Sequence, residues 1–408
     1  MHLEALQGRG RVEGDLGVET ARSPVWLEVA VLDQRLRAWA VRALTVTAAP
    51  PAVAPTGQLD GGPVEGRRRP RQGNLTCTDR KGGSETGFES HLRPDAGSEA
   101  TVTYVPVTEG RLKIAVLGPG GVGGLLAAVL ARSGDSVVVL AGDDTAEAIA
   151  RDGIRLASMR FGDFEAPVQT ATRLSEPVDA CLITVKATHL PDAVTRVPAD
   201  VLGDGLVIPF LNGLEHVEFL RSVYPPSSVA AATIRVEAVR EGPGVIRQTS
   251  PFVIIEIATS GENRDRVESI AAHLSGAGFD VKVRDNEQAM LWDKFVLLEP
   301  FALLTTHERA NAGTIRNKRR DDAIALLSEA VAVAAADGVV MDRDAALKIF
   351  DSLPESMESS MQRDQAAGRP LELDALGGAL LRRARKAGIS VPVTARLVEE
   401  IRRSDGRT

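Results

Sequence analysis

The chain has 408 residues, enough for two or three domains, and its 44% hydrophobic and 25% charged residues are typical of a globular protein. A formal net charge of −7 disfavours nucleic-acid and anionic-membrane partners, since both need a concentrated positive field. Its two cysteines, Cys77 and Cys181, lie far apart and outside any metal-ligand spacing. We therefore expect no disulfide, no bound metal and a reducing, cytoplasmic setting.

The first 110 residues differ in composition from the rest. They contain the runs AAPPAVAPTG, GGPVEGRRRPRQG and DRKGGSETG and show no sustained hydrophobic period. Such a sequence cannot bury enough apolar surface to offset its ordering entropy, so we expect residues 1–110 to form a disordered extension, with a short helix over 25–48 as an alternative for that stretch. The hydrophobic run at 26–32 is short and unlike a secretory signal, and no run reaches the roughly 20 residues that span a bilayer.

From residue 111 the pattern changes to that of an α/β protein. Short apolar runs bounded by turn residues predict strands at 113–118, 136–140, 180–185, 206–211, 252–257 and 281–283. Helical patterns at 123–133 and 146–152 separate the first of these strands. Strands that alternate with helices imply a parallel sheet with right-handed crossovers, and we assign this sheet domain to residues 111–285.

Strand patterns end after residue 286. Helical periodicity covers 287–306, 321–337, 343–350 and 373–387, with breaks at glycine and proline residues between these segments. The sequence therefore predicts an all-α domain over residues 286–405.

A glycine-rich turn joins the first predicted strand to the first predicted helix. Its residues are Gly118, Pro119, Gly120, Gly121, Val122 and Gly123, which fit the pattern G-x-G-x-x-G. In this context the first glycine permits a tight turn, the second lets a pyrophosphate approach the backbone, and the third lets helix pack on strand. The N-terminus of the helix would attract the phosphates, so the fold class is a Rossmann-type dinucleotide-binding domain followed by an all-α domain.

The residue after the second strand informs the choice of cofactor. Asp143 lies twenty residues beyond Gly123, where an acidic side chain commonly binds the adenosine ribose, and no arginine occupies this turn. Both NADH and NADPH stay open as cofactors. The alternative is that Asp143 is an ordinary turn residue.

Six further motifs complete a recognisable pattern. They are TVK at 184–186, LNG at 211–213, LWDK at 291–294, SSMQRD at 359–364, ELD at 372–374 and RRAR at 382–385. In this order and spacing, over about 112–403, they resemble the ketopantoate reductase (2-dehydropantoate 2-reductase) family. The resemblance implies NAD(P)H-dependent reduction of a 2-keto acid, with an active site between the two predicted domains.

The resemblance also implies roles for single residues. Lys294 would be the general acid for the substrate carbonyl, and Glu372 would hold Lys294 by a charge-assisted hydrogen bond and contact the cofactor. Ser360 would bind the substrate, Asn212 the nicotinamide ribose, and Lys186 both cofactor and substrate. Ordinary alternatives are a surface lysine for Lys294 or Lys186, an Asn-Gly turn at Asn212, a helix cap at Ser360 and a surface acid at Glu372.

If Lys294 lies on a helix, Leu298 and Ala302 share its face. This apolar face should desolvate the ammonium group and lower its pKa. The family commonly has asparagines at these two positions, which bind polar groups of the substrate. Their absence leaves ketopantoate as the leading substrate and a less hydroxylated 2-keto acid as the alternative.

A non-catalytic dinucleotide sensor is a second alternative, but it has no need for Lys294, Ser360 and Glu372 together. We expect a small-molecule partner and allow for a homodimer. Of the six histidines, His189 and His216 follow strand-end motifs and could line the cleft, although loop histidines are the commoner case.

Overall fold

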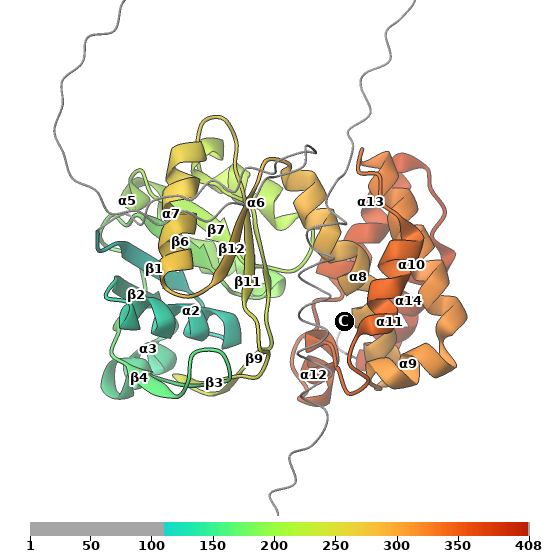
Figure 1. Cartoon of the computed structure of the whole chain (residues 1–408), viewed down its shortest axis with the longest axis horizontal. Helices are drawn as coiled ribbons and strands as arrows, with labels where there is room; N and C mark the ends of the chain where they lie inside the picture. The colour runs from blue at the N-terminus through green and yellow to red at the C-terminus, as the bar shows by residue number, and fades with distance from the viewer. Residues whose placement is uncertain (1–109, 407–408) are drawn as a thin grey trace, which may run out of the picture. The chain divides into compact units, whose positions relative to one another are not determined.

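The computed structural model describes residues 110–406, and all of them belong to one compact unit (Figure 1). The disordered extension predicted for residues 1–110, like the alternative helix over 25–48, lies outside the described residues apart from Gly110. No helix in the described part is long and apolar enough to cross a membrane.

The central sheet is parallel, as predicted. Its strand order is β5-β2-β1-β6-β7, and every neighbouring pair is parallel. The strands are β1 (Lys113–Leu117), β2 (Ser136–Leu140), β5 (Gln169–Ala171), β6 (Ala180–Ile183) and β7 (Leu206–Pro209). Because β1 lies in the middle, the turn that follows it opens at the carboxyl edge of the sheet, where ligands of such folds bind.

Two smaller sheets complete the strand-containing part. One has the order β4-β3-β10-β9 and the other β12-β11-β8, in which β8 runs antiparallel to β11. Their strands are β3 (Ile154–Ser158), β4 (Phe164–Ala166), β8 (Ala232–Arg235), β9 (Ala238–Gly242), β10 (Val245–Gln248), β11 (Ile254–Ala258) and β12 (Asp280–Arg284). Of these, the sequence analysis predicted only β11 and β12.

Six α-helices and three 3₁₀ turns accompany the sheets within residues 110–276 of the described chain. They are α2 (Gly121–Arg132), α3 (Asp143–Asp152), η1 (Ala187–His189), α4 (Leu190–Ala193), η2 (Val194–Arg196), α5 (Ala199–Leu202), α6 (His216–Val223), η3 (Pro226–Ser228) and α7 (Arg264–Gly276). Helix α2 packs on β1 and β2 directly after the glycine turn.

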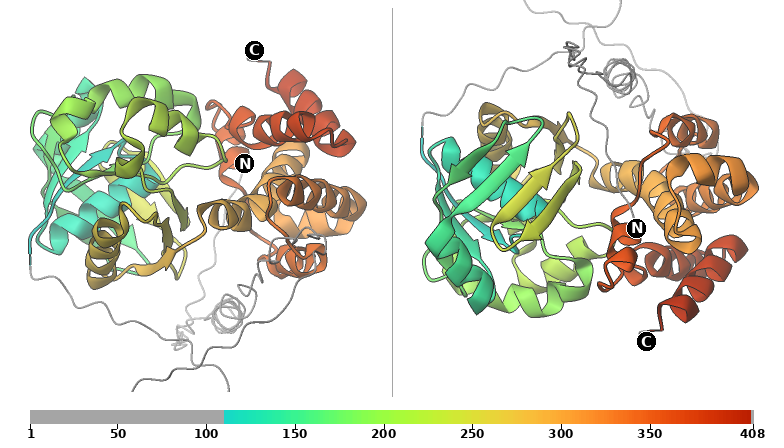
Figure 2. Two further views of the ribbon diagram at one scale, coloured as in Figure 1. Left: turned by 90° about the horizontal axis from the view of Figure 1, so that it is seen from above. Right: turned by 90° about the horizontal axis from the view of Figure 1, so that it is seen from below.

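The rest of the described chain is helical, as predicted. The elements are α8 (Glu287–Glu308), α9 (Ala312–Lys318), α10 (Arg320–Ala336), α11 (Arg343–Ser352), α12 (Ser360–Ala366), the π-helical turn η4 (Asp374–Gly378), α13 (Ala379–Ala387) and α14 (Pro392–Asp405). Helix α8 packs on β8 and β11 as well as on α10, α12 and α14. It therefore lies between the sheets and the other helices, as the views show (Figures 1 and 2).

Alternating side chains divide the buried residues into two cores. Val116 and Ile208 face a core shared with α2 and α7. Leu117 and Val207 point the other way, into a core that continues through Trp292 of α8 to the last helices. Because this second core is continuous, the carboxyl edge of the sheet and helix α8 are packed against each other.

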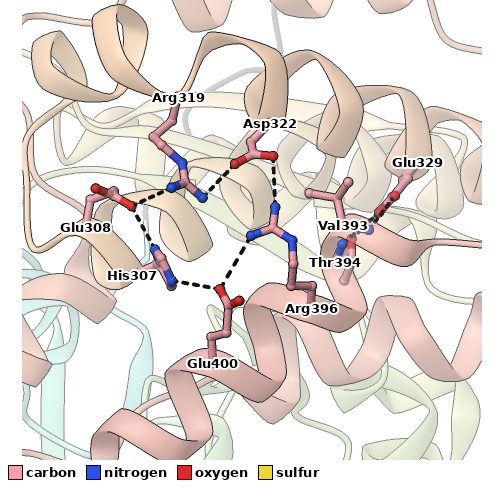
Figure 3. A network of polar contacts seen from close by, with 9 residues as sticks. All are labelled: His307, Glu308, Arg319, Asp322, Glu329, Val393, Thr394, Arg396 and Glu400. Carbon is pink, nitrogen blue, oxygen red and sulfur yellow. Dashed lines mark hydrogen bonds and ion pairs between the residues drawn. The ribbon is translucent and has the colours of Figure 1, made fainter.

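Charged side chains hold the helices together near the end of α8 (Figure 3). His307 contacts Glu308 and Glu400, and the ring of contacts closes through three further side chains, Arg319, Asp322 and Arg396. Beside this ring, the Glu329 carboxylate accepts hydrogen bonds from the backbone N–H groups of Val393 and Thr394, at 2.8 and 2.9 Å, and from the Thr394 hydroxyl. Glu329, a residue of α10, thus accepts the hydrogen bonds of backbone N–H groups in the first turn of α14, which have no partner within that helix.

We predict that Glu329→Ala lowers the free energy of unfolding by about 2 kcal/mol, because it leaves buried donors unpaired. Urea unfolding followed by circular dichroism measures the change. Glu399→Ala, on the exposed side of α14, should change stability by less than about 0.5 kcal/mol. Equal effects of the two substitutions would contradict the capping role of Glu329.

Candidate active site

The glycine turn has the geometry that a phosphate-binding turn needs. Gly118 has a φ of +90°, and its N–H donates to the Leu140 carbonyl of the neighbouring strand at 3.0 Å. The Thr184 hydroxyl donates to the Gly118 carbonyl at 2.7 Å. At Gly123 an added Cβ would lie 2.3 Å from that same carbonyl oxygen, so only glycine lets α2 pack this closely.

Gly120 differs from its neighbours because an added Cβ would meet no atom of the described structure within 4 Å. It precedes the first residue of α2, and no side chain caps that end of the helix. The first N–H groups of α2 thus lack a side-chain cap, and the room beside Gly120 fits a bound pyrophosphate. Pro119 is buried beside Gly120, whereas Gly121 and Val122 are half-buried; at Gly121 a Cβ would collide with the Ala238 carbonyl of β9.

Asp143 is the first residue of α3 and is exposed just beyond the carboxyl end of β2. Since β2 neighbours β1, this carboxylate lies on the same edge of the sheet as the glycine turn. Its position is that expected of a ribose-binding acid.

A chain of hydrogen bonds joins the strand ends to the helices. The Lys294 amine of α8 donates to Asn212 Oδ1 at 2.9 Å, and Asn212 Nδ2 donates to Glu372 Oε2 at 3.0 Å. The other oxygen of Glu372 accepts from the backbone N–H of Ala187 at 3.0 Å. Asn212 follows β7 and Ala187 follows β6, so two strand ends, α8 and the segment before η4 meet here.

One expectation needs correction. We expected Glu372 to hold Lys294 by a direct hydrogen bond, but in the described structure Asn212 lies between the two side chains. An amide can do this because its oxygen accepts from the ammonium group while its nitrogen donates to the carboxylate. The amine thus keeps donors free for a ligand.

The surroundings of Lys294 are apolar, as the sequence indicated. Leu298 and Phe295 line a small cavity with it, together with Leu211, Gly213, Thr233 and Leu291. Burial, helped by the positive charge of Arg235, lowers the pKa of Lys294 to about 8. The amine therefore changes protonation state near neutral pH and can act as a proton donor.

His216 at the start of α6 is buried, and neither of its ring nitrogens has a hydrogen-bond partner within the described residues. Burial, together with the charge of Lys294, lowers its pKa to about 3, so the ring is neutral. The other strand-end histidine, His189, is exposed.

Lys186 forms an ion pair that the sequence analysis did not predict. Its amine lies 2.6 Å from an oxygen of Asp364, and Arg369 donates to the other oxygen at 2.8 Å. Asp364 is buried in α12. The SSMQRD motif contained this residue, but sequence spacing does not show which cation a helical carboxylate will meet.

Ser360 is exposed at the first position of α12. The helix cap that was the alternative for Ser360 is formed by Ser359 instead. The hydroxyl of Ser359 accepts from the Gln362 N–H at 3.1 Å and from Thr305 Oγ1 at 2.7 Å. Ser360 thus has its side chain left for a ligand.

The glycine after Asn212 explains why this turn is built as Asn-Gly. Gly213 has a φ of +104°, and an added Cβ would lie 2.6 Å from the carbonyl oxygen of Ala375 in η4. Any other residue would strain the backbone and push the strand end away from the helices. The Asn-Gly turn that was the alternative for Asn212 is therefore present, and the Asn212 side chain nevertheless bonds Lys294 and Glu372.

A glycine turn with room for a pyrophosphate and a half-buried amine at the same sheet edge are typical of a dinucleotide-binding oxidoreductase of the α/β class. Comparison with known proteins gives the family. The model of the ketopantoate reductase PanE/ApbA family matches residues 114–259, and the model of its C-terminal region matches residues 286–404. The chain belongs to the ketopantoate reductase family and is an oxidoreductase of the 2-dehydropantoate 2-reductase type.

Individual relatives agree. A 2-dehydropantoate 2-reductase of Mycobacterium tuberculosis is 31% identical over 297 residues, which are 70% of this chain and 95% of the relative. The crystal structure of a PanE/ApbA family ketopantoate reductase from Ralstonia eutropha superposes with a TM-score of 0.66 at 29% identity, covering 72% and 99% of the two chains. D-mandelate dehydrogenase with NADH and anilino(oxo)acetate shares the fold, with a TM-score of 0.68 at 20% identity over 72% and 99% of the chains.

We predict that Gly213→Ala lowers the free energy of unfolding by about 1–3 kcal/mol and moves Asn212 away from Lys294, so that kcat also falls by at least about tenfold. Urea unfolding and steady-state kinetics measure the two effects. Gly388→Ala is the matched control, since its φ of +69° is also positive but a Cβ there meets open space. Gly388→Ala should lower the free energy of unfolding but leave kcat unchanged. Loss of activity in both variants would argue against a special role of the 212–213 turn.

Proposed function

We propose that the protein uses NADPH or NADH to reduce a 2-keto acid to a 2-hydroxy acid, with 2-dehydropantoate (ketopantoate) to pantoate, a step toward pantothenate and coenzyme A, as the leading substrate pair. The observation that carries the proposal is the half-buried Lys294 amine, which Asn212 holds at the sheet edge that also carries the glycine turn. We place the reaction in the cytoplasm, and a homodimer stays a prediction.

The cofactor would bind along the carboxyl edge of the sheet. The turn from Gly118 to Gly123 would hold its pyrophosphate, and Asp143 its adenosine ribose. Asn212, Lys186 and Glu372 would contact its nicotinamide half. The cofactor supplies the hydride; the chain must orient the substrate and deliver a proton. In this proposal residues 111–285 form the dinucleotide-binding domain and 286–405 the domain that supplies the catalytic amine.

Lys294 is the proposed proton donor. When the carbonyl carbon accepts a hydride, negative charge develops on its oxygen, and an ammonium group placed there stabilises that charge and gives up a proton. Asn212 fixes the direction of the amine, while Glu372, one hydrogen bond further, offsets part of the cost of burying a positive charge. Ser360 would hydrogen-bond the substrate from α12.

The substrate is the finer part of the proposal. Leu298 and Ala302 leave the α8 wall without polar groups at the positions that the family commonly fills with asparagine. This favours, as a second candidate, a 2-keto acid with fewer hydroxyl groups than ketopantoate. A non-catalytic dinucleotide sensor would need neither the lowered pKa of Lys294 nor its hydrogen-bond chain.

The proposal is tested by mixing the purified protein with NADPH or NADH and a panel of 2-keto acids, and following the loss of cofactor absorbance. We expect turnover with at least one 2-keto acid, and turnover with ketopantoate would establish the leading substrate. Lys294→Ala should lower kcat by about 10²–10⁴-fold, while the exposed Lys348→Ala should leave it unchanged. Cofactor binding without any turnover would select the sensor, and full activity in Lys294→Ala would remove Lys294 from the mechanism.

The pH dependence of kcat/KM follows from the pKa of Lys294 in the free protein. Only the protonated amine can donate, so kcat/KM should be constant below about pH 8 and fall about tenfold per pH unit above it. An ordinary lysine would keep kcat/KM constant to about pH 10. Steady-state rates at low substrate concentration between pH 6 and 10 test this, and the fall above pH 8 must be absent from the residual activity of Lys294→Ala.

A further inference from the structure

Strand β8 presents two polar side chains to the helix that carries Lys294. Ala232 and Ile234 point into the core shared with α2 and α7. Successive side chains of a strand alternate between faces, so Thr233 and Arg235 lie on the opposite face. Since β8 packs on α8, this is the face turned toward Lys294.

The Thr233 hydroxyl lacks a partner. Thr233 is 2% exposed and lines the small cavity beside Lys294, yet its Oγ1 has no hydrogen-bond partner within the described residues. A buried hydroxyl without a partner costs about 1–3 kcal/mol. Its position indicates a site where a ligand oxygen completes the hydrogen bonding.

Arg235 brings an excess of positive charge to this site. It donates to Glu256 at 2.6 Å, but Glu256 also accepts from Arg284 at 2.5 Å, and Arg284 in turn pairs with Asp293, the neighbour of Lys294. Lys282 lies directly opposite Glu256 on β12. Counting Lys294 and the Glu372 carboxylate that Asn212 links to it, four cations therefore share three carboxylates.

Arg235 is the accessible end of this chain of charges. Its side chain is 35% exposed, compared with 11% for Arg284, and its charge is felt at Lys294. The repulsion between two neighbouring cations is relieved by an anion bound between them. A guanidinium group also matches a carboxylate with two parallel donors, which an ammonium group cannot do.

We propose that Arg235, assisted by the Thr233 hydroxyl, binds the carboxylate group of the 2-keto acid substrate. The inference rests on the proposed function. In a 2-keto acid the carboxylate is bonded to the carbonyl carbon, so an anion held between Arg235 and Lys294 brings the reacting oxygen to the Lys294 amine. Leu298, which lines the cavity, then faces the rest of the substrate, which fits an apolar side chain.

The test compares a 2-keto acid with its uncharged methyl ester. We expect wild-type protein to prefer the acid and Arg235→Gln to lose this preference, with KM for the acid raised about 10–100-fold and the ester unaffected. The dissociation constant of NADPH should stay unchanged. In Arg235→Gln the fall in kcat/KM at alkaline pH should begin at a higher pH, because removing a positive charge near Lys294 raises the pKa of its amine.

Matched variants separate this role from a structural one. Arg240→Gln removes an exposed arginine from β9, which follows β8 in the chain but belongs to another sheet, and should change none of these quantities. Arg235→Lys should restore part of the preference. If Arg235→Gln does not fold because Glu256 loses a partner, the double variant Arg235→Gln/Glu256→Gln removes the unpaired carboxylate as well.

Binding of oxamate, a carboxylate analogue of a 2-keto acid, gives a readout without turnover. Calorimetry in the presence of the cofactor should show at least tenfold weaker binding to Arg235→Gln. An unchanged acid-to-ester preference, unchanged oxamate binding, or oxamate that does not bind wild-type protein would overturn the inference. A wild-type protein that binds oxamate through Arg235 but turns over no 2-keto acid would instead count against the proposed function alone.

Discussion

The structure of the site depends on burying one ammonium group. Lys294 lies among apolar residues of α8, and a charge that is removed from water must be paired or become neutral. The chain solves this with a neutral amide: Asn212 accepts from the amine and passes the interaction to Glu372, which is itself held by the Ala187 N–H. A carboxylate in direct contact would keep the amine charged well above neutral pH. Burial and the positive charge of Arg235 lower the pKa of Lys294 to about 8, where a proton can be given and regained, while Glu372 opposes this shift from beyond Asn212.

The hydrogen bond between Lys294 and Asn212 also explains why the backbone of the turn after β7 must keep its conformation. Asn212 and Gly213 bring a strand end against η4, and the positive φ of Gly213 with the nearby Ala375 carbonyl leaves no room for a side chain. The continuous core from Leu117 and Val207 to Trp292 holds α8 against the sheet at the required distance. The position of the Lys294 amine therefore depends on the packing of α8 against the sheet, since a shift of α8 would break the hydrogen bond between Lys294 and Asn212.

The sequence predicted those elements whose structure is determined by one property of their own residues. Strands β1, β2, β6 and β7 are short apolar runs buried on both faces, and α8 has a long helical pattern that starts at an asparagine cap, so their burial is visible in the residues themselves. The glycine turn was predicted because its spacing reflects backbone geometry. Strands β9 and β10 were missed because exposed polar side chains interrupt their apolar runs, and β8 was missed because only two of its four residues, Ala232 and Ile234, are apolar. Asp364, Thr233 and Arg235 were missed for another reason: their surroundings come from elements far away in the chain, and no local pattern records such pairings.

Leu298 and Ala302 looked at first like the loss of a binding site, because the family commonly uses asparagines there. The structure supports a different argument. The apolar positions on α8 are accompanied by polar side chains on β8. The Thr233 hydroxyl, which has no partner among the described residues, lines the cavity beside Lys294, and Arg235, which shares the Glu256 carboxylate with Arg284, lies on the same face of the strand. A site of this kind recognises the charge that every 2-keto acid carries and leaves the side chain to apolar contacts. Affinity then rests on desolvated ion pairing near Lys294, and selectivity among substrates rests on shape, which discriminates less sharply than hydrogen bonds to hydroxyl groups would.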